Sequence, residues 1–192
     1  EHILYENKPH IGTDILADVI KRMREFMTEN GVEFLFETCV TGFSTGKNGN
    51  LKSIELNHDR QIDTDCLILA IGHSARDTFS LLQEKGLNMQ AKSFAVGFRV
   101  EHPQSEVNLT QYGDLYADKL PAASYKVTAN LPSGRGVYSF CMCPGGYVVN
   151  ASSMKEKTCV NGMSYSGRSG KNANSAIIVS VSPADYGAQD PL

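Results

Sequence analysis

The stretch CLILAIG, residues 66–72, decides the fold, because it is a short apolar run that ends in a small residue and a glycine. A run of this length without polar alternation predicts a strand that is buried on both faces. A second run of this kind, VEFLF, covers residues 32–36. Between the two runs, residues 40–44, 51–56 and 61–64 are separated by polar turns rich in Asn and Gly. They are expected to form a three-stranded antiparallel meander.

Helical patterns surround these strands. Residues 13–30 repeat apolar side chains at helical spacing, and Thr13 or Asp14 is expected to cap the start of this helix. Residues 75–85 predict a shorter helix. This order of elements resembles the middle of a glutathione-reductase-like FAD domain. The resemblance implies that segments 32–36 and 66–72 lie side by side as parallel strands, with the meander as an excursion between them.

The pattern changes after residue 87, where short strand-like segments alternate with Pro- and Gly-containing turns. Strands are predicted over 93–102, 126–131, 136–143, 146–152 and 176–182, with a short helix over 103–112 and a long loop over 153–175. This half is expected to be a mostly antiparallel α+β domain. The fold class is therefore α/β plus α+β, with one domain over residues 1–88 and a second over 89–192.

Composition excludes several classes of function. The formal net charge is −3 with acids and bases mixed along the chain, so nucleic acid is not an expected partner. The longest apolar run is far too short to cross a bilayer, and the first ten residues lack the apolar core of a secretory signal. Five cysteines, an odd number, favour a reducing cytoplasm. Exposed sheet edges could pair two copies of the chain into a homo-oligomer.

A dinucleotide-binding fold normally carries the motif G-x-G-x-x-G between a strand and a helix, and the sequence contains no match to it. Those glycines let the backbone approach the pyrophosphate, while the helix N-terminus adds positive potential. We therefore expect the chain by itself to lack the main anchor of a dinucleotide.

Two segments could still contact a cofactor. In AIGHSARDTF (70–79), a glycine at the end of a strand lets a cofactor pass close to the backbone, whereas the plain alternative is a turn capped by Ser74. In KPHIGTD (8–14), a loop precedes a helix start, where Lys8 and His10 favour an anion. The plain alternative there is an ordinary helix start.

Two further segments carry reactive or polar side chains. FCMCPGG (140–146) places Cys141 and Cys143 beside a Pro-Gly-Gly turn, where they are either a redox pair or two small residues at a strand end. Zinc would need two more ligands, and no close Cys or His pair supplies them, so no metal site is expected. The segment 161–175 is either a ligand-facing loop or a polar linker.

Taken together, the sequence resembles the uncharacterised FAD-dependent, or NAD-utilising, dehydrogenases of bacteria. These are flavoproteins with two dinucleotide-binding domains and a glutathione-reductase-like FAD fold. The resemblance rests on KPHIGTDIL, DCLILAIGHSARDTF, FAVGFRVEHPQ, YSFCMCPGGYVVNASS and NGMSYSGRSGKNANSAIIVSV. It implies that the G-x-G-x-x-G unit lies upstream of residue 1 and that a last FAD-contacting segment lies downstream of residue 192. The chain is then an internal piece: the middle of the FAD domain followed by an inserted second domain.

The resemblance also implies roles for single residues. The expected cofactor-binding residues are Val40, Ala70, Ile71, Gly72, His73, Lys8, Gly12 and Thr13. The expected catalytic residues are His73, His10, Cys141 and Cys143. The expected substrate-loop residues are Arg168, Asn172 and Asn174.

The implied function is a flavin-dependent dehydrogenase that moves hydride between a nicotinamide, NADH or NADPH, or an organic substrate and FAD. The chain alone is expected to be inactive and to hold no FAD. Two alternatives stay open. One is a cysteine-dependent enzyme that uses Cys141 or Cys143 with His73 or His102. The other is a non-catalytic module that binds a ligand or partner through residues 153–175.

Overall fold

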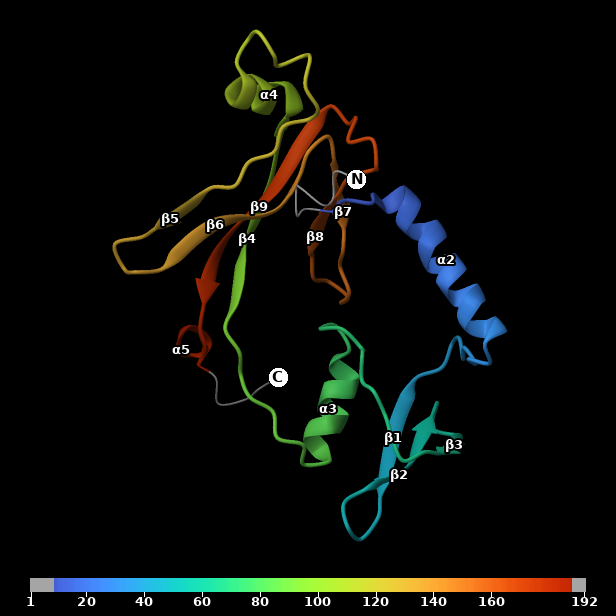
Figure 1. The fold of residues 1–192 in the computed structure, drawn as a ribbon. Coiled ribbons are helices and arrows are strands. Elements are labelled where there is room, and N and C mark those ends of the chain that lie inside the picture. Colours follow the sequence, from blue (N-terminus) through green and yellow to red (C-terminus); the bar gives the residue numbers. More distant parts are fainter. Residues whose placement is uncertain (1–8, 188–192) are drawn as a thin grey trace. The chain divides into compact units, whose positions relative to one another are not determined.

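A four-stranded antiparallel sheet dominates the larger of the two units into which the chain divides (Figure 1). The structure is a computed structural model that describes residues 9–187. The larger unit contains the described residues up to Asn30 together with Ser93–Asp185, and the smaller contains Gly31–Lys92. The domain division expected at residues 88 and 89 stays a prediction about the longer protein. Among residues 9–187, no helix is both long and apolar enough to span a bilayer.

The strand order in the large sheet is β4-β9-β6-β5. Its strands are β4 (Phe94–Pro103), β5 (Thr128–Asn130), β6 (Gly136–Cys143) and β9 (Asn172–Val181). The β4–β9 ladder runs without a break from Phe94 opposite Val181 to Pro103 opposite Asn172. These strands confirm the antiparallel second half that the sequence predicted.

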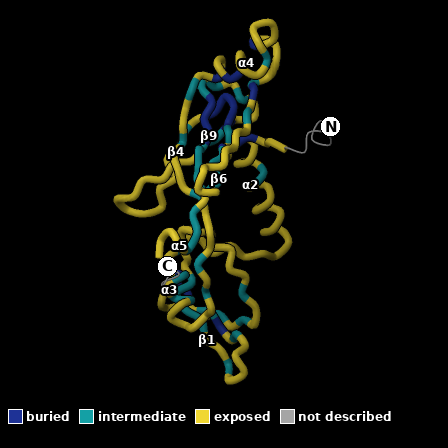
Figure 2. Tube along the Cα trace, turned by 90° about the vertical axis from the view of Figure 1, so that its left-hand side faces the viewer, coloured by how far each residue is buried: buried dark blue, intermediate teal, exposed yellow. Residues whose placement is uncertain are grey.

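The core of this unit lies where helix α4 (Gln104–Tyr112) meets β9. Val107, Ala123 and Ala173 are its buried apolar side chains, and Figure 2 shows the buried stretch of β9 in dark blue. Gln104 is also buried, and its amide nitrogen donates to Asn108 Oδ1 and to the carbonyl oxygen of Ala123. These bonds satisfy the polar group, so α4 is fixed at the end of the sheet by apolar packing and by hydrogen bonds together.

The segment 153–175, predicted as one long loop, contains strand β8 (Val160–Met163) and the first residues of β9. Strand β8 forms a hairpin with β7 (Tyr147–Asn150). The loop prediction was wrong because Asn174 and Ser175 are fully buried in a ladder. Polar composition resembles that of a loop, although here Asn174 Oδ1 accepts from Arg99 and the Ser175 hydroxyl donates to the Phe140 carbonyl oxygen.

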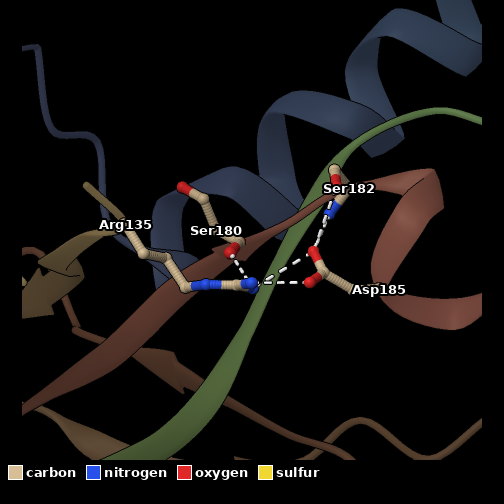
Figure 3. Close-up of polar contacts among 4 residues, drawn as sticks. All are labelled: Arg135, Ser180, Ser182 and Asp185. Atoms are coloured by element: carbon tan, nitrogen blue, oxygen red, sulfur yellow. Dashed lines mark hydrogen bonds and ion pairs between the residues drawn. The ribbon is translucent and has the colours of Figure 1, made fainter. Parts of the chain in front are cut away.

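The end of β9 is fixed by Arg135 (Figure 3). Its guanidinium donates to the carbonyl oxygen of Ser180 and to both carboxylate oxygens of Asp185, at distances of 3.0, 3.1 and 2.5 Å. Asp185, in the short helix α5 (Pro183–Tyr186), also accepts from the backbone N–H of Ser182 at 2.7 Å. Arg135 first and then these Ser182 contacts hold the pKa of Asp185 far below its usual value.

In the smaller unit the predicted meander is confirmed. Strands β1 (Val40–Thr45), β2 (Leu51–Leu56) and β3 (Arg60–Asp63) pair antiparallel in sequence order. Helix α3 (Arg76–Glu84) contacts β1. The buried side chains of β2 are Ser53 and Leu56, which are three positions apart and therefore lie on opposite faces of the strand.

The two parallel strands predicted over 32–36 and 66–72 were not found. Both segments lie outside any strand, and no residue of either segment pairs in a ladder among the described residues. Their apolar side chains are largely exposed, with Ile68 at 86%. An apolar run specifies a strand only when a partner strand supplies hydrogen bonds, and none of the described strands does so.

The predicted first helix is confirmed as α2 (Thr13–Glu29), but its expected cap was wrong. Gly12 occupies the N-cap position, and no side chain caps the helix, because Thr13 and Asp14 both bond to residues 163–166 instead. No residue of α2 is buried, and most of its apolar side chains, including Ile20 and Phe26, are exposed.

Candidate functional site

A cleft of about 340 Å³ in the larger unit brings together three of the segments singled out in the sequence. We call it the 141–168 cleft. Its walls come from the loop and first turn at 9–16, from the bulged strand end at 141–144, and from residues 162–164 with Arg168. The size lies at the lower end of the range for small-molecule sites.

The first wall is held against residues 164–166 by short polar contacts. The backbone N–H and the hydroxyl of Thr13 both donate to the Ser164 carbonyl oxygen, at 3.2 and 3.3 Å. His10 Nε2 lies 3.2 Å from the Tyr165 carbonyl oxygen, so that nitrogen carries the proton and donates. Asp14 accepts from Ser166 with both carboxylate oxygens, which lowers the pKa of Asp14.

Gly12 makes this docking possible. Its φ is +85°, in the left-handed region that side chains rarely adopt, and a Cβ added there would overlap the backbone nitrogen of Ser166. Only glycine therefore permits the chain to pass so close to residue 166.

The second wall is a break in the β6–β9 ladder. Phe140 pairs with Ala176 and Cys143 with Asn174, so one extra residue is accommodated between them. Such β-bulges re-aim side chains and occur next to active sites more often than elsewhere. Within the bulge, Cys141 has a φ of +48°, a conformation that costs about 1–3 kcal/mol in a non-glycine residue.

Arg99 of β4 supports the bulge from the far side of β9, which lies between β4 and β6. Its guanidinium donates to the Cys141 carbonyl oxygen at 3.1 Å, to Asn174 Oδ1 at 2.6 Å and to Asn161 Oδ1 at 3.4 Å. Sequence reasoning missed Arg99. The available signal was a single charged residue inside the apolar strand FAVGFRV.

The two cysteines differ in environment. Cys141 is exposed and Cys143 is buried, and the Cys143 thiol donates to the Cys141 carbonyl oxygen at 3.3 Å. Burial, followed by the neighbouring Cys141, raises the pKa of Cys143, although Arg99 opposes this shift. Among the described residues, no hydrogen bond joins either cysteine to His73 or His102.

The turn after the cysteines closes the cleft. Ser164 donates its hydroxyl to the Pro144 carbonyl oxygen at 3.0 Å, and the N–H of Gly145 donates to Gln104 Oε1 at 2.8 Å. A Cβ on Gly145 would overlap the carbonyl oxygen of Arg168. Arg168 itself has a φ of +46°, and its Nε is buried without a hydrogen-bond partner.

The remaining residues that the sequence predicted as site residues do not line the 141–168 cleft. Asn172 donates to Glu101 at 2.5 Å, and Asn174 contacts Arg99, so both act within the sheet. Val40 begins β1, while Ala70, Ile71, Gly72 and His73 form an exposed segment of the smaller unit. Lys8 lies outside the described residues. No group of three or more His, Cys, Asp or Glu side chains within residues 9–187 could hold a metal.

The described residues meet part of what a dinucleotide cofactor needs. A Cβ on Gly72, whose φ is +69°, would meet nothing within 4 Å, so its backbone is open to an approaching group. The pyrophosphate anchor is not found among residues 9–187. The start of α2 does not supply it, because the Thr13 N–H already donates to Ser164 and Asp14 adds a negative charge.

Comparison with known proteins gives a consistent assignment. Residues 2–105 match the family model for pyridine nucleotide-disulphide oxidoreductases. Residues 93–192 match the model for the C-terminal domain-like region of FAD-dependent proteins. An uncharacterised protein of Clostridium beijerinckii is 47% identical over 192 residues, which cover 99% of this chain and 36% of the relative. The chain thus spans about a third of the length of that curated relative.

Each family model covers more than half of the chain, and together they extend over residues 2–192. The chain therefore belongs to the FAD-dependent proteins of the pyridine nucleotide-disulphide oxidoreductase family.

Proposed function

We propose that the chain is part of a flavin-dependent dehydrogenase that moves hydride between FAD and a nicotinamide or an organic substrate, and that the 141–168 cleft receives the substrate. One observation carries the second half of this proposal. Loop 9–13, the Cys141 bulge and Arg168 are far apart in the sequence, yet they line one cleft of small-molecule size.

The residues of the cleft suit this task. Arg168 offers a cation, and its Nε has no hydrogen-bond partner among residues 9–187, which favours a substrate with an acidic or carbonyl oxygen. His10 lines the same cleft, and with Nε2 bonded to the Tyr165 carbonyl oxygen it leaves Nδ1 as its second proton-exchanging atom. FAD, when bound, supplies the hydride chemistry, and Ala70–His73 would provide one wall for it.

The test uses the full-length protein loaded with FAD and mixed anaerobically with NADH or NADPH. Bleaching of the flavin absorbance is expected with at least one nicotinamide. A full-length protein that binds no flavin, or whose flavin neither nicotinamide reduces, would defeat the dehydrogenase assignment.

The cleft is tested by Arg168→Met, with Arg22→Met on the exposed surface of α2 as the matched control. If the cleft receives the reductant, Arg168→Met raises its apparent Kd about tenfold, the equivalent of ~1.4 kcal/mol, and the control leaves it unchanged. If the cleft receives an organic substrate instead, Arg168→Met raises the apparent Kd of that substrate by the same factor, measured in the half-reaction that reoxidises the flavin. Unchanged constants in both half-reactions would remove the cleft from the proposal.

A further inference from the structure

The 141–168 cleft combines one permanent positive charge with apolar walls. Among the described residues that line it, Arg168 is the one Lys or Arg, and none is Asp or Glu. The apolar side chains that line it are Pro9, Ile11, Leu16, Met142, Pro144 and Met163. In small-molecule sites, apolar walls receive the body of the ligand and a few polar groups fix its orientation. The lining therefore indicates a ligand with a single negative group on an apolar body.

The guanidinium of Arg168 is available to such a ligand. Its Nε is buried and has no hydrogen-bond partner among residues 9–187. The ion pairs formed among these residues do not include Arg168. A buried donor without an acceptor destabilises a protein, whereas an anion at a guanidinium forms strong, charge-assisted hydrogen bonds. Arg168 thus lacks the anionic partner that its chemistry favours.

The backbone holds Arg168 at the cleft in a strained conformation. Its φ of +46° lies in the left-handed region, and a Cβ on Gly145 would overlap its carbonyl oxygen. The Arg168 N–H donates to the Tyr165 carbonyl oxygen at 3.1 Å, and the Gly170 N–H donates to the Gly145 carbonyl oxygen at 3.0 Å. Such strain persists only where the surrounding structure imposes it, and it is concentrated at ligand sites. Residue 168 is therefore positioned before a ligand arrives, which lowers the entropy cost of binding.

The charge of the cleft distinguishes between classes of anion. A nicotinamide dinucleotide carries one negative charge on each phosphate of its pyrophosphate, and a phosphate monoester carries about −1.5 to −2 near neutral pH. One guanidinium balances only part of either charge. The Asp14 carboxylate, bonded to Ser166 and next to the lining residue Thr13, repels further negative charge. A carboxylate carries one charge, and its two oxygens match the paired N–H groups of a guanidinium.

We propose that the 141–168 cleft binds a small monocarboxylic acid with an apolar body, with the carboxylate on Arg168 and the body against Met142 and Met163. Under the proposed function, on which this assignment rests, the acid is the organic substrate and the nicotinamide reduces the flavin elsewhere. The volume of about 340 Å³ suits a small acid. Methionine side chains adapt to apolar bodies of different shape, so the carboxylate is the feature that the cleft selects.

The experiment measures binding to the full-length protein as purified, with carbon-13 in the methionine methyl groups. Met142→Leu and Met163→Leu identify the two resonances that report on the cleft. Met154, which is 43% exposed and does not line the cleft, supplies the control resonance. Three probes share one apolar body: hexanoate, its neutral isostere hexanamide, and hexyl phosphate. The oxidised nicotinamide dinucleotides are titrated in parallel.

Hexanoate should shift the Met142 and Met163 resonances, but not that of Met154, with a Kd about tenfold below those of hexanamide and hexyl phosphate. The nicotinamide dinucleotides should leave both cleft resonances in place. Arg168→Met should abolish the difference between hexanoate and hexanamide, and the surface control Arg22→Met should keep it.

The comparison of probes on the wild-type protein tests the proposal without any variant. Equal constants for hexanoate and hexanamide, tighter binding of hexyl phosphate, a dinucleotide that shifts the cleft resonances, or no shift with any probe would each overturn it. A preference for hexanoate that survives in Arg168→Met would overturn it as well. Flavin reduction by NADH and NADPH is measured separately on the same preparation. Because carboxylate binding needs no hydride transfer, a failure of that reduction counts only against the dehydrogenase assignment.

Discussion

The carboxylate of Asp14 accepts the backbone N–H of Ser166 at 2.8 Å and its hydroxyl at 2.6 Å, although the two residues are 152 positions apart. With the Thr13–Ser164 bonds, this contact fixes the start of α2 as one wall of the 141–168 cleft. The position of this wall therefore depends on the negative charge of the Asp14 carboxylate.

The Asp14 contact should weaken in acid. Its bonds to Ser166 lower the pKa of Asp14 below 3.8, so the stabilisation is complete above that unfolded value and is lost as pH falls through the lower folded value. The Ser166 amide resonance should titrate with a midpoint below 3.8, and in Asp14→Asn this transition should vanish. A midpoint at or above 3.8 would mean that the bonds do not form in solution.

Gly12→Ala should destabilise the larger unit by about 2–4 kcal/mol, because left-handed backbone strain of about 1–2 kcal/mol adds to overlap with the Ser166 backbone. Gly31→Ala is the matched control, since Gly31 has a φ of +87° with nothing within 4 Å of its would-be Cβ. The free energy of unfolding in urea is measured for both variants. Gly31→Ala reports the backbone strain alone, and the additional loss in Gly12→Ala reports the overlap with Ser166. Equal losses would show that residue 12 does not pack on residue 166.

Arg99→Lys should lower stability by about 1–3 kcal/mol despite the retained charge, because an ammonium group cannot serve the Cys141 carbonyl, Asn161 and Asn174 together. Asn174 is fully buried, and its Nδ2 already lacks a partner. The free energy of unfolding in urea measures the effect, with the exposed Arg22→Lys as control. A loss no larger than that of the control would place Arg99 outside the support of the bulge.

The parts of the fold that sequence reasoning found depend on local patterns. Helical spacing identified α2, and alternation with polar turns identified the meander and β6, whose bounds match the predicted 136–143. The KPHIGT, CMCPGG and Arg168 segments were nominated from side-chain chemistry, and they meet in one cleft.

What was missed depends on contacts distant in sequence. The polar start of β9 is a strand only because β4 and β6 satisfy it, and Asp14 gives up capping because Ser166 lies beside it. Neither partner is visible from local composition. The run 66–72 fails for the opposite reason: its local signal is strong, but none of the described strands pairs with it.

Asp185→Asn should destabilise the end of β9 at neutral pH, where the carboxylate pairs with Arg135. That pairing and the Ser182 contacts lower the pKa of Asp185. The contribution is therefore complete above the unfolded value of 3.8 and decreases as pH falls below it. Urea midpoints of variant and wild type should converge in acid. A difference that is independent of pH would assign the effect to packing.

Ile68→Thr tests whether the exposed run 66–72 becomes a buried strand in the longer protein. Ile68 is 86% exposed in this chain, so the substitution should change its stability by no more than about 0.5 kcal/mol. In the full-length protein the same change should weaken FAD binding, because a hydroxyl would enter a strand that is buried on both faces. Leu56→Ala is the control, since Leu56 is 4% exposed and should cost about 2–5 kcal/mol in either context. If Ile68→Thr leaves FAD affinity and stability unchanged in the full-length protein, the run stays at the surface there too, and the parallel-strand arrangement is wrong for the whole protein.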